Sequence, residues 1–179
     1  MYAIISELDA DSSAYVRNLW YRFREACGLK GIYDLPTPHL TWFTAEDLDI
    51  PASASIIANL AVSTRKMITY VYGVGIFSGV RPVIYLPMVK SKGMIDLHHQ
   101  IWDQVQGFAD LPNWYYTPPH WLPHITLAVN DLSPENLVCA LELVSFETIE
   151  MTVTVNNLLI VAQETDPASE TLHRYRLGD

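Results

Sequence analysis

Two pairs of histidine and threonine stand out in this sequence, because both occur in the same short pattern. The first copy is Pro38-His39-Leu40-Thr41-Trp42 and the second is Pro123-His124-Ile125-Thr126-Leu127. Alternate residues of a strand point to the same face. Each copy would therefore present an imidazole and a hydroxyl on one face and two apolar side chains on the other. The repeat predicts two matched sets of polar groups that meet in one site.

Imidazole is the side chain that both takes and gives a proton near pH 7. We expect one of His39 and His124 to act as a general base and the other as a general acid, with no metal or cofactor. The sequence leaves open which is which. Thr41 and Thr126 would hydrogen-bond the non-bridging oxygens of a phosphate without adding charge. These groups suit acid–base chemistry at phosphorus.

The elements that position the motifs follow the same order in each half of the chain. We expect helices to begin at Asp11 or Ser12, near Pro51, at Ser91 and at Ser133, from capping residues and apolar spacing. Strands are expected at residues 2–8, 38–44, 67–77, 82–89, 124–129, 148–162 and 172–177. No Gly/Ser linker separates the halves. We therefore expect a single domain over residues 1–179, made of two packed lobes with one motif each.

Composition excludes several classes of function. The chain has 179 residues, 50% of them hydrophobic, and a net charge of −9. No Lys or Arg occurs between Gly93 and His173, so tight binding of long nucleic acid is not expected. No apolar stretch is long enough for a membrane helix, and no signal peptide is apparent. We expect a cytoplasmic protein, monomeric, that acts on a small nucleotide or a short oligonucleotide.

Two cysteines, Cys27 and Cys139, lie in apolar helical patterns. Their positions do not match the spacing of a metal site, and we expect two buried thiols. Separate thiols are consistent with a reducing cytoplasm.

The sequence resembles the two-histidine phosphoesterases, which include the bacterial 2'-5' RNA ligase-like proteins and cyclic phosphodiesterases. Besides the two motifs, Gly73–Phe77 and Arg81–Leu86 are similar to the hairpin between the motifs of those proteins. The resemblance implies an α+β, bilobal fold with pseudo-twofold symmetry, with antiparallel sheets and helices in each lobe and the active site in the cleft between them. It also implies that His39, Thr41, His124 and Thr126 are the site residues.

The resemblance further implies an enzyme, a hydrolase that opens a 2',3'-cyclic phosphate or an ADP-ribose cyclic phosphate, or that cuts a 2'-5' phosphodiester. Many relatives carry a basic residue just after the second motif, where this chain has Val129-Asn130. That departure argues against ligation of polynucleotides. Two alternatives stay open: 2'-5' RNA ligase activity in the reverse direction, and a module that binds a nucleotide or phosphate without turnover. A non-catalytic interaction protein ranks third.

A few other residues are candidates for contact with a substrate. Tyr116 and Trp121, in the Pro-rich loop before the second motif, and Tyr33, before the first, could stack a nucleobase. Aromatic residues in such loops more often pack against their own domain. Arg174 and Arg176 would share one face of a strand, and we favour a solvated strand edge for them. His98 and His99 are adjacent on a helix and diverge by roughly 100°, which disfavours a shared metal.

Overall fold

The computed structural model of the protein describes residues 1–34, 37–162 and 170–178. Within these ranges the helices are α1 (Ala10–Cys27), α2 (Ile50–Ser63), α3 (Lys92–Val105) and α4 (Pro134–Val144), with short 3-10 helices η1 (Gly31–Asp34), η2 (Gln106–Phe108) and η3 (Trp114–Tyr116). The strands are β1 (Tyr2–Glu7), β2 (His39–Ala45), β3 (Asp47–Leu48), β4 (Met67–Tyr72), β5 (Gly75–Phe77), β6 (Val83–Pro87), β7 (Ala109–Asp110), β8 (His124–Ala128), β9 (Glu150–Val155), β10 (Asn157–Ala162) and β11 (Glu170–Arg176). The fold is mixed α/β with antiparallel sheets.

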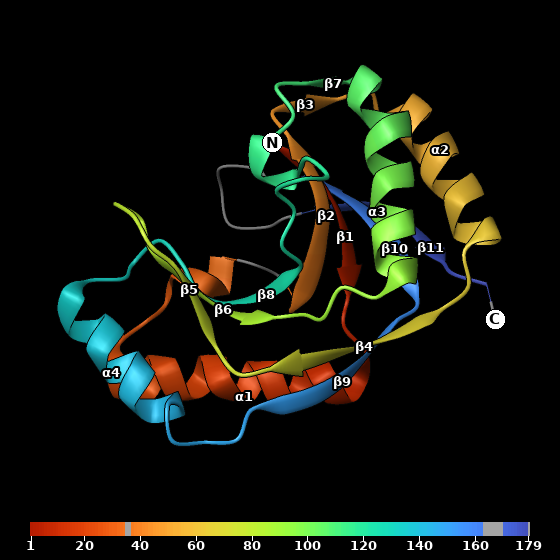
Figure 1. The fold of residues 1–179 in the computed structure, drawn as a ribbon. Coiled ribbons are helices and arrows are strands. Elements are labelled where there is room, and N and C mark those ends of the chain that lie inside the picture. Colours follow the sequence, from red (N-terminus) through yellow and green to blue (C-terminus); the bar gives the residue numbers. More distant parts are fainter. Residues whose placement is uncertain (35–36, 163–169, 179) are drawn as a thin grey trace.

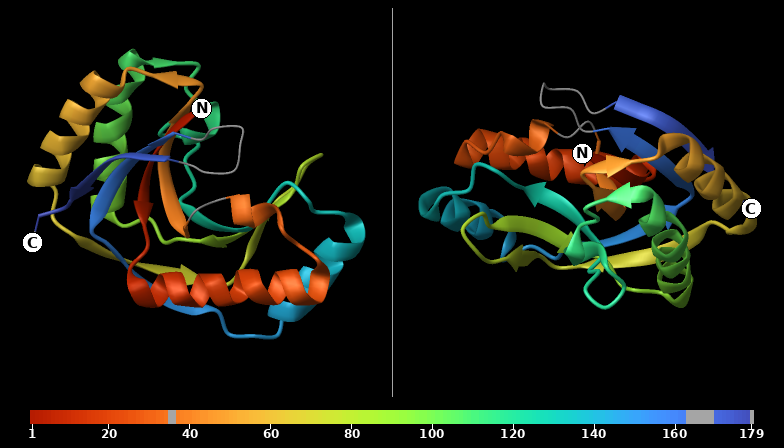
Figure 2. Two further views of the ribbon diagram at one scale, coloured as in Figure 1. Left: turned by 180° about the vertical axis from the view of Figure 1, so that it is seen from behind. Right: turned by 90° about the horizontal axis from the view of Figure 1, so that it is seen from above.

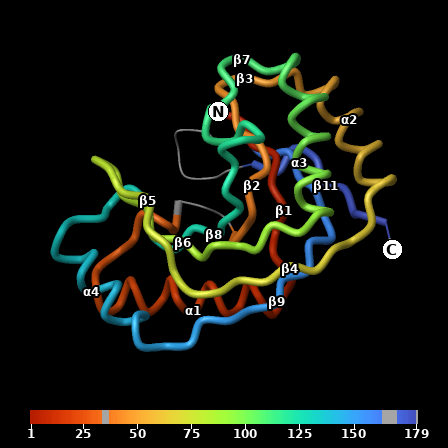
Figure 3. The backbone as a smooth tube through the Cα atoms, viewed as in Figure 1, coloured from red at the N-terminus to blue at the C-terminus, as the bar shows by residue number. Residues whose placement is uncertain are grey.

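One seven-stranded sheet forms the centre of the molecule, in the order β11-β10-β1-β2-β8-β6-β5. Two small ribbons, β3–β7 and β4–β9, lie outside it. Figure 1 shows the two motif strands, β2 and β8, side by side near the middle of the molecule. The path of the chain through the sheet can be followed in Figure 3. This topology brings together two segments that lie far apart in the sequence.

Two pairs of helices flank the sheet at opposite ends (Figures 1 and 2). Helices α2 and α3 pack together, with α2 against β10 and β11 and α3 against β2. Helices α1 and α4 pack together at the other end, with α1 against β8 and β9. Each pair thus joins a helix from each half of the chain. The helices of the two halves expected from sequence are therefore interleaved in space.

Helix starts follow local sequence closely. Ser91 and Ser133 cap α3 and α4 by accepting backbone N–H bonds, as expected, and Ser133 with Asn136 completes a capping box. The first helix begins earlier than expected, because Asp9 is its cap and accepts the N–H of Ser12. Asp49, just before Pro51, caps α2. These side chains satisfy N–H groups that the helices cannot satisfy themselves.

Two strands expected to be continuous are each split in two. The run at residues 67–77 becomes β4 and β5, and the run at residues 148–162 becomes β9 and β10. Gly73 interrupts the first run with a φ of +69°, a left-handed conformation that favours glycine. Its N–H donates to Ile149 O (2.9 Å), which fixes the turn against the start of the second run. The splits allow β4 and β9 to leave the central sheet and pair as a ribbon.

The apolar residues of both motifs lie in the main core. Leu40, Trp42, Ile125 and Leu127 are all fully buried. They pack in the same cluster as residues from all four helices. Burial of this side of both strands fixes their register, because a slip of one residue would turn the apolar side chains outward. The opposite side of each strand is therefore free to carry polar groups.

The expectation of two separate thiols is wrong. Cys27 and Cys139 form a disulfide, with their Cα atoms 5.7 Å apart. It joins the end of α1 to α4, whose packing against each other could not be read from the sequence. A structural disulfide is uncommon in a reducing cytoplasm, so the thiols no longer support the cytoplasmic location. Among the described residues, none of the helices is both long and apolar enough to cross a membrane.

Candidate active site

The two motif strands pair directly and in opposite directions. Leu40 of β2 is paired with Ile125 of β8 in antiparallel register. On either side of this pair, His39 lies toward Thr126 and Thr41 lies toward His124, because the strands run in opposite directions. Strand alternation puts these four polar side chains on the same face of the sheet. We call this the motif face.

Neighbouring strands extend the motif face on both sides. Glu7 and Ile5 of β1 are paired with His39 and Thr41. Tyr85 and Pro87 of β6 are paired with Thr126 and His124. A carboxylate therefore lies beside the first histidine, whereas the second histidine has an apolar neighbour.

Each histidine is held by the carbonyl two residues before it. His39 Nδ1 lies 2.8 Å from Thr37 O, and His124 Nδ1 lies 2.7 Å from Leu122 O. A carbonyl only accepts hydrogen bonds, so Nδ1 carries the proton in both rings. The Nε2 atom of each neutral ring is then left with its lone pair. The same local device thus gives both histidines the tautomer that a general base at Nε2 requires.

Burial lowers the pKa of both histidines. The pKa of His39 is lowered by desolvation, against the raising effects of Thr37 O and the Glu7 charge. The pKa of His124 is lowered by desolvation and also by the charge of His39, against the raising effect of Leu122 O. The two rings interact electrostatically, so protonation of one disfavours protonation of the other. The state in which both rings are protonated is therefore disfavoured.

Two tryptophans fix the backbone of the motifs in matching ways. Trp20 of α1 donates its indole N–H to Thr126 O (3.0 Å), and Trp121 donates its indole N–H to Thr41 O (3.0 Å). Both side chains are buried, at 2% exposure each. Trp20 could not be recognised as a site residue from the sequence, because its helical spacing is that of any core residue.

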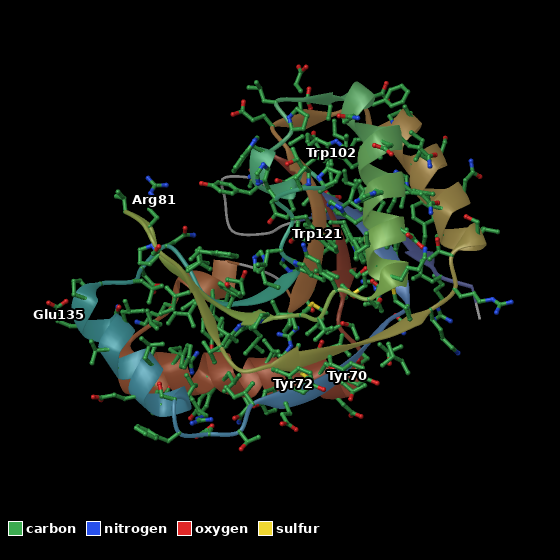
Figure 4. All side chains as sticks on the ribbon, viewed as in Figure 1. Tyr70, Tyr72, Arg81, Trp102, Trp121 and Glu135 are labelled. Atoms are coloured by element: carbon green, nitrogen blue, oxygen red, sulfur yellow. A yellow bond between two sulfur atoms is a disulfide. The ribbon has the colours of Figure 1, made fainter. Side chains whose placement is uncertain are left out.

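Trp121 is buried, whereas a residue that stacks on a nucleobase needs an exposed ring face. Its ring stacks on His98 (centroids 4.0 Å apart) and on Trp42 (5.2 Å). Figure 4 shows Trp121 in the interior near β2 and α3. With 2% of its surface exposed, it offers no open ring face to a nucleobase. Its position is that of a support beneath the first motif.

His98 belongs to the same buried support. Burial lowers the pKa of His98 to about 4, against the hydrogen bond between its Nε2 and Tyr116 O (3.0 Å). The side chain of His99 points to solvent. Over residues 1–34, 37–162 and 170–178, no cluster of three or more His, Cys, Asp or Glu side chains is arranged to hold a metal ion.

Tyr116 and Tyr33 lie at different distances from the motifs. Burial raises the pKa of the Tyr116 phenol, against the lowering effect of the neighbouring Thr41 side chain. This places Tyr116 within the site.

Tyr33 is 43% exposed and meets the edge of Trp20 at 6.3 Å, with the Arg24 guanidinium 5.3 Å from its ring. Tyr33 lines an open cavity of about 580 Å³ together with Arg24, Glu25 and Lys30, none of which belongs to the motifs.

An aromatic pair beside His124 was missed as a site element. Phe77 of β5 stacks on Tyr85 of β6 (4.0 Å), and both rings meet the His124 ring edge-on, at 5.0 and 5.4 Å. Gly75 makes room for this arrangement, since a Cβ there would overlap the Tyr85 ring. In β6, strand alternation places Tyr85 on the same face as Thr126. That signal could be used only once the pairing of β6 with β8 was known.

Arg174 and Arg176, both expected on a solvated strand edge, have different surroundings, and Arg81 lies far from both. Arg174 forms an ion pair with Glu7 (Nη1 to Oε2, 2.6 Å), beside His39. Arg176 is exposed. Arg81 lies at the tip of the β5–β6 hairpin and points away from the molecule (Figure 4). Of these three residues, Arg174 is the one placed against the motif residues.

Comparisons with known proteins agree with the fold. A profile of the 2'-5' RNA ligase superfamily matches residues 10–167. The structure of TT0787 from Thermus thermophilus superposes with a TM-score of 0.73 at 18% identity, covering 98% of this chain and 97% of that one. No protein with a curated description matches the sequence.

E. coli LigT has also been solved with nucleotides bound. Its complex with 3'-AMP superposes with a TM-score of 0.63 at 16% identity, covering 99% of this chain and 98% of that one. Its complex with NADP+ gives a TM-score of 0.60 at 17% identity, covering 99% and 97%. Likeness at this level of identity concerns the fold.

Proposed function

The chain belongs to the 2'-5' RNA ligase superfamily, and on that premise we propose that it is a phosphoesterase in which His39 and His124 act as an acid–base pair. The substrate is a 2',3'-cyclic phosphate, an ADP-ribose cyclic phosphate or a 2'-5' phosphodiester, carried on a small nucleotide or short oligonucleotide. One observation supports the proposal above the others. Both histidines have Nδ1 bound to a carbonyl and lie beside each other's threonine on one face.

The proposed hydrolysis needs one proton taken and one proton given. The neutral histidine removes a proton from water through Nε2 while the water oxygen forms a bond to phosphorus. The phosphorus–oxygen bond to the ribose breaks, and the protonated histidine gives its Nε2 proton to that oxygen. Thr41 and Thr126 donate hydrogen bonds to the non-bridging oxygens. Each proton transfer contributes roughly 10²–10⁴-fold in rate.

The surroundings of the two rings suggest which histidine is the acid. Glu7 is paired with His39 and raises the pKa of that ring relative to its burial alone. His124 meets Phe77 and Tyr85, and the His39 charge lowers its pKa further. We therefore assign the acid role to His39, as the protonated ring, and the base role to His124, as the neutral ring. In the ligating direction the roles exchange.

The test is an assay of the purified protein, with EDTA present, on 2',3'-cyclic nucleotides, ADP-ribose cyclic phosphate and a 2'-5' dinucleotide. Chromatography follows the products. We expect product from at least one of these substrates, and turnover lower by roughly 10²–10⁴-fold in His39→Ala and His124→Ala. His99→Ala, an exposed histidine outside the site, is the matched control and should keep full activity.

Several results would contradict the proposal. Normal turnover by either motif variant, with its circular dichroism spectrum unchanged, would remove the acid–base pair. Binding of nucleotide by the wild-type protein with no product from any substrate would favour the non-catalytic binding module instead. Product that forms in a parallel assay without EDTA, and is lost when EDTA is added, would show that a metal takes part.

A further inference from the structure

Strand pairing carries Arg174 onto the motif face, although it is far from both motifs in the sequence. Thr41 is paired with Ile5, Ile5 with Leu159, and Leu159 with Arg174. Paired residues of neighbouring strands point to the same side of a sheet. Arg174 therefore shares the face of the motif histidines and threonines, and Tyr175 points to the other side.

The Arg174 side chain reaches back toward the first motif. Its Nη1 donates to Glu7 Oε2 at 2.6 Å, and Glu7 is paired with His39. Neighbouring strands are about 4.8 Å apart, so the carboxylate that holds the guanidinium lies on the strand next to His39. Half of the Arg174 side chain remains exposed, against 24% for Glu7. A guanidinium has five N–H donors, and one bond to a carboxylate leaves others directed to solvent.

Positive charge is scarce near the motifs, and Arg174 supplies it on the motif face. The motif side chains bring no permanent positive charge, and the sequence carries no Lys or Arg from Gly93 to His173. A second cation near the first motif is Arg17 of α1, whose Nη2 lies 3.4 Å from Thr37 Oγ1. Thr37 precedes the motif strand, whereas Arg174 lies on the motif face itself. An Arg held by a carboxylate is pre-organised to bind a phosphate with its remaining donors.

We propose that Arg174, held in place by Glu7, binds a second phosphate of the substrate, next to the one that reacts. This inference rests on the proposed function and names the substrate class more closely. The preferred substrate is a nucleotide with a phosphate besides the scissile one, such as a 5'-phosphorylated 2',3'-cyclic nucleotide. A plain nucleoside 2',3'-cyclic phosphate lacks the group that Arg174 recognises.

The experiment compares adenosine 2',3'-cyclic phosphate with and without a 5'-phosphate, by kcat/KM. We expect the wild-type protein to prefer the 5'-phosphorylated compound. Arg174→Gln should lower kcat/KM for that compound by about 10- to 100-fold, as expected for loss of a charged hydrogen bond. Its kcat/KM for the other compound should fall much less, because that compound lacks the group that Arg174 binds. Arg174→Lys should restore part of the loss, because lysine keeps the charge without the fork.

Arg176→Gln is the matched control, since it removes the same charge from the same exposed strand. It should leave the preference for the 5'-phosphate intact. Equal losses in Arg174→Gln and Arg176→Gln would reduce the effect to overall charge and overturn the proposal. So would an equal effect of Arg174→Gln on both substrates, or a loss confined to Arg17→Gln.

A binding measurement separates this proposal from the proposed function. Calorimetry compares adenosine 3'-monophosphate with adenosine 3',5'-bisphosphate, which differ only in the 5'-phosphate. We expect the wild-type protein to bind the bisphosphate more tightly and Arg174→Gln to lose that difference, whether or not any cyclic phosphate is turned over. Equal dissociation constants of the wild-type protein for both compounds, or absence of binding to either, would overturn the role of Arg174.

Discussion

The two motif strands share their backbone supports but differ in what surrounds their histidines. In both, Nδ1 meets the carbonyl two residues before it, and a buried tryptophan binds the carbonyl of the threonine. Beyond these supports, His39 has a carboxylate as neighbour and His124 has two aromatic rings. The comparison separates two tasks. The matched supports orient the rings, and the unmatched neighbours give them different affinities for a proton.

The largest expected effect tests whether the two histidines act as one unit. His39→Ala and His124→Ala should each lower kcat by roughly 10²–10⁴-fold. The double variant should be no slower than the slower single variant, because the two proton transfers belong to one reaction step and the loss of either already removes their joint contribution. Steady-state rates of the three variants give the answer. Losses that multiply in the double variant would mean that the histidines act independently.

The matched supports predict matched losses of stability. Trp20→Phe and Trp121→Phe each leave the carbonyl of a motif threonine without its indole partner. The free energy of unfolding should fall by about 1–3 kcal/mol in each case from the lost hydrogen bond. Urea denaturation measures it, with Trp114→Phe, an exposed tryptophan, as the control. If either variant at the motifs is as stable as the control, its indole is not a support.

The aromatic side of the comparison predicts a smaller effect on rate. Phe77→Leu removes one ring that contacts His124 and keeps the apolar character of the site. An aromatic contact contributes about 0.5–1.5 kcal/mol, so kcat/KM should fall by about 2- to 10-fold. Exposed Phe146→Leu provides the control, with full activity expected. A rate equal to that of the wild-type protein would show that Phe77 does not position His124.

The smallest effect concerns the carboxylate beside His39. Glu7 raises the pKa of His39, so Glu7→Gln should lower that pKa and move the alkaline limb of the pH–rate profile to lower pH. The acid limb, which belongs to His124 as base, should move less. Glu150→Gln, at an exposed position on β9, controls for net charge. An alkaline limb that stays in place in Glu7→Gln would assign the acid role elsewhere.

Local sequence was enough to predict the motifs and most helix starts. The four motif side chains were identified from repetition and strand alternation, and the structure brings them to one face. Ser91 and Ser133 were identified as caps because capping depends on residues three apart. In each of these cases the determining interactions lie within a few residues along the chain.

Features that depend on pairing between distant segments could not be predicted. The Glu7–Arg174 ion pair needs the order of β1, β10 and β11, and the disulfide needs the packing of α1 on α4. Trp121 and Tyr116 come from the same loop, yet one is buried under β2 and the other contacts Thr41. The shape of the space within the core decides which aromatic side chain of this loop packs inward. That shape cannot be read from the sequence.

The pH dependence of kcat/KM in the wild-type protein tests the acid–base pair most directly. The profile should be bell-shaped, because the base must be neutral and the acid protonated. Its acid limb should lie below pH 6.5, the ordinary pKa of histidine, since burial lowers the pKa of His124. A rate that is flat or changes in one direction only between about pH 4 and 9 would contradict a mechanism in which two histidines have opposite roles.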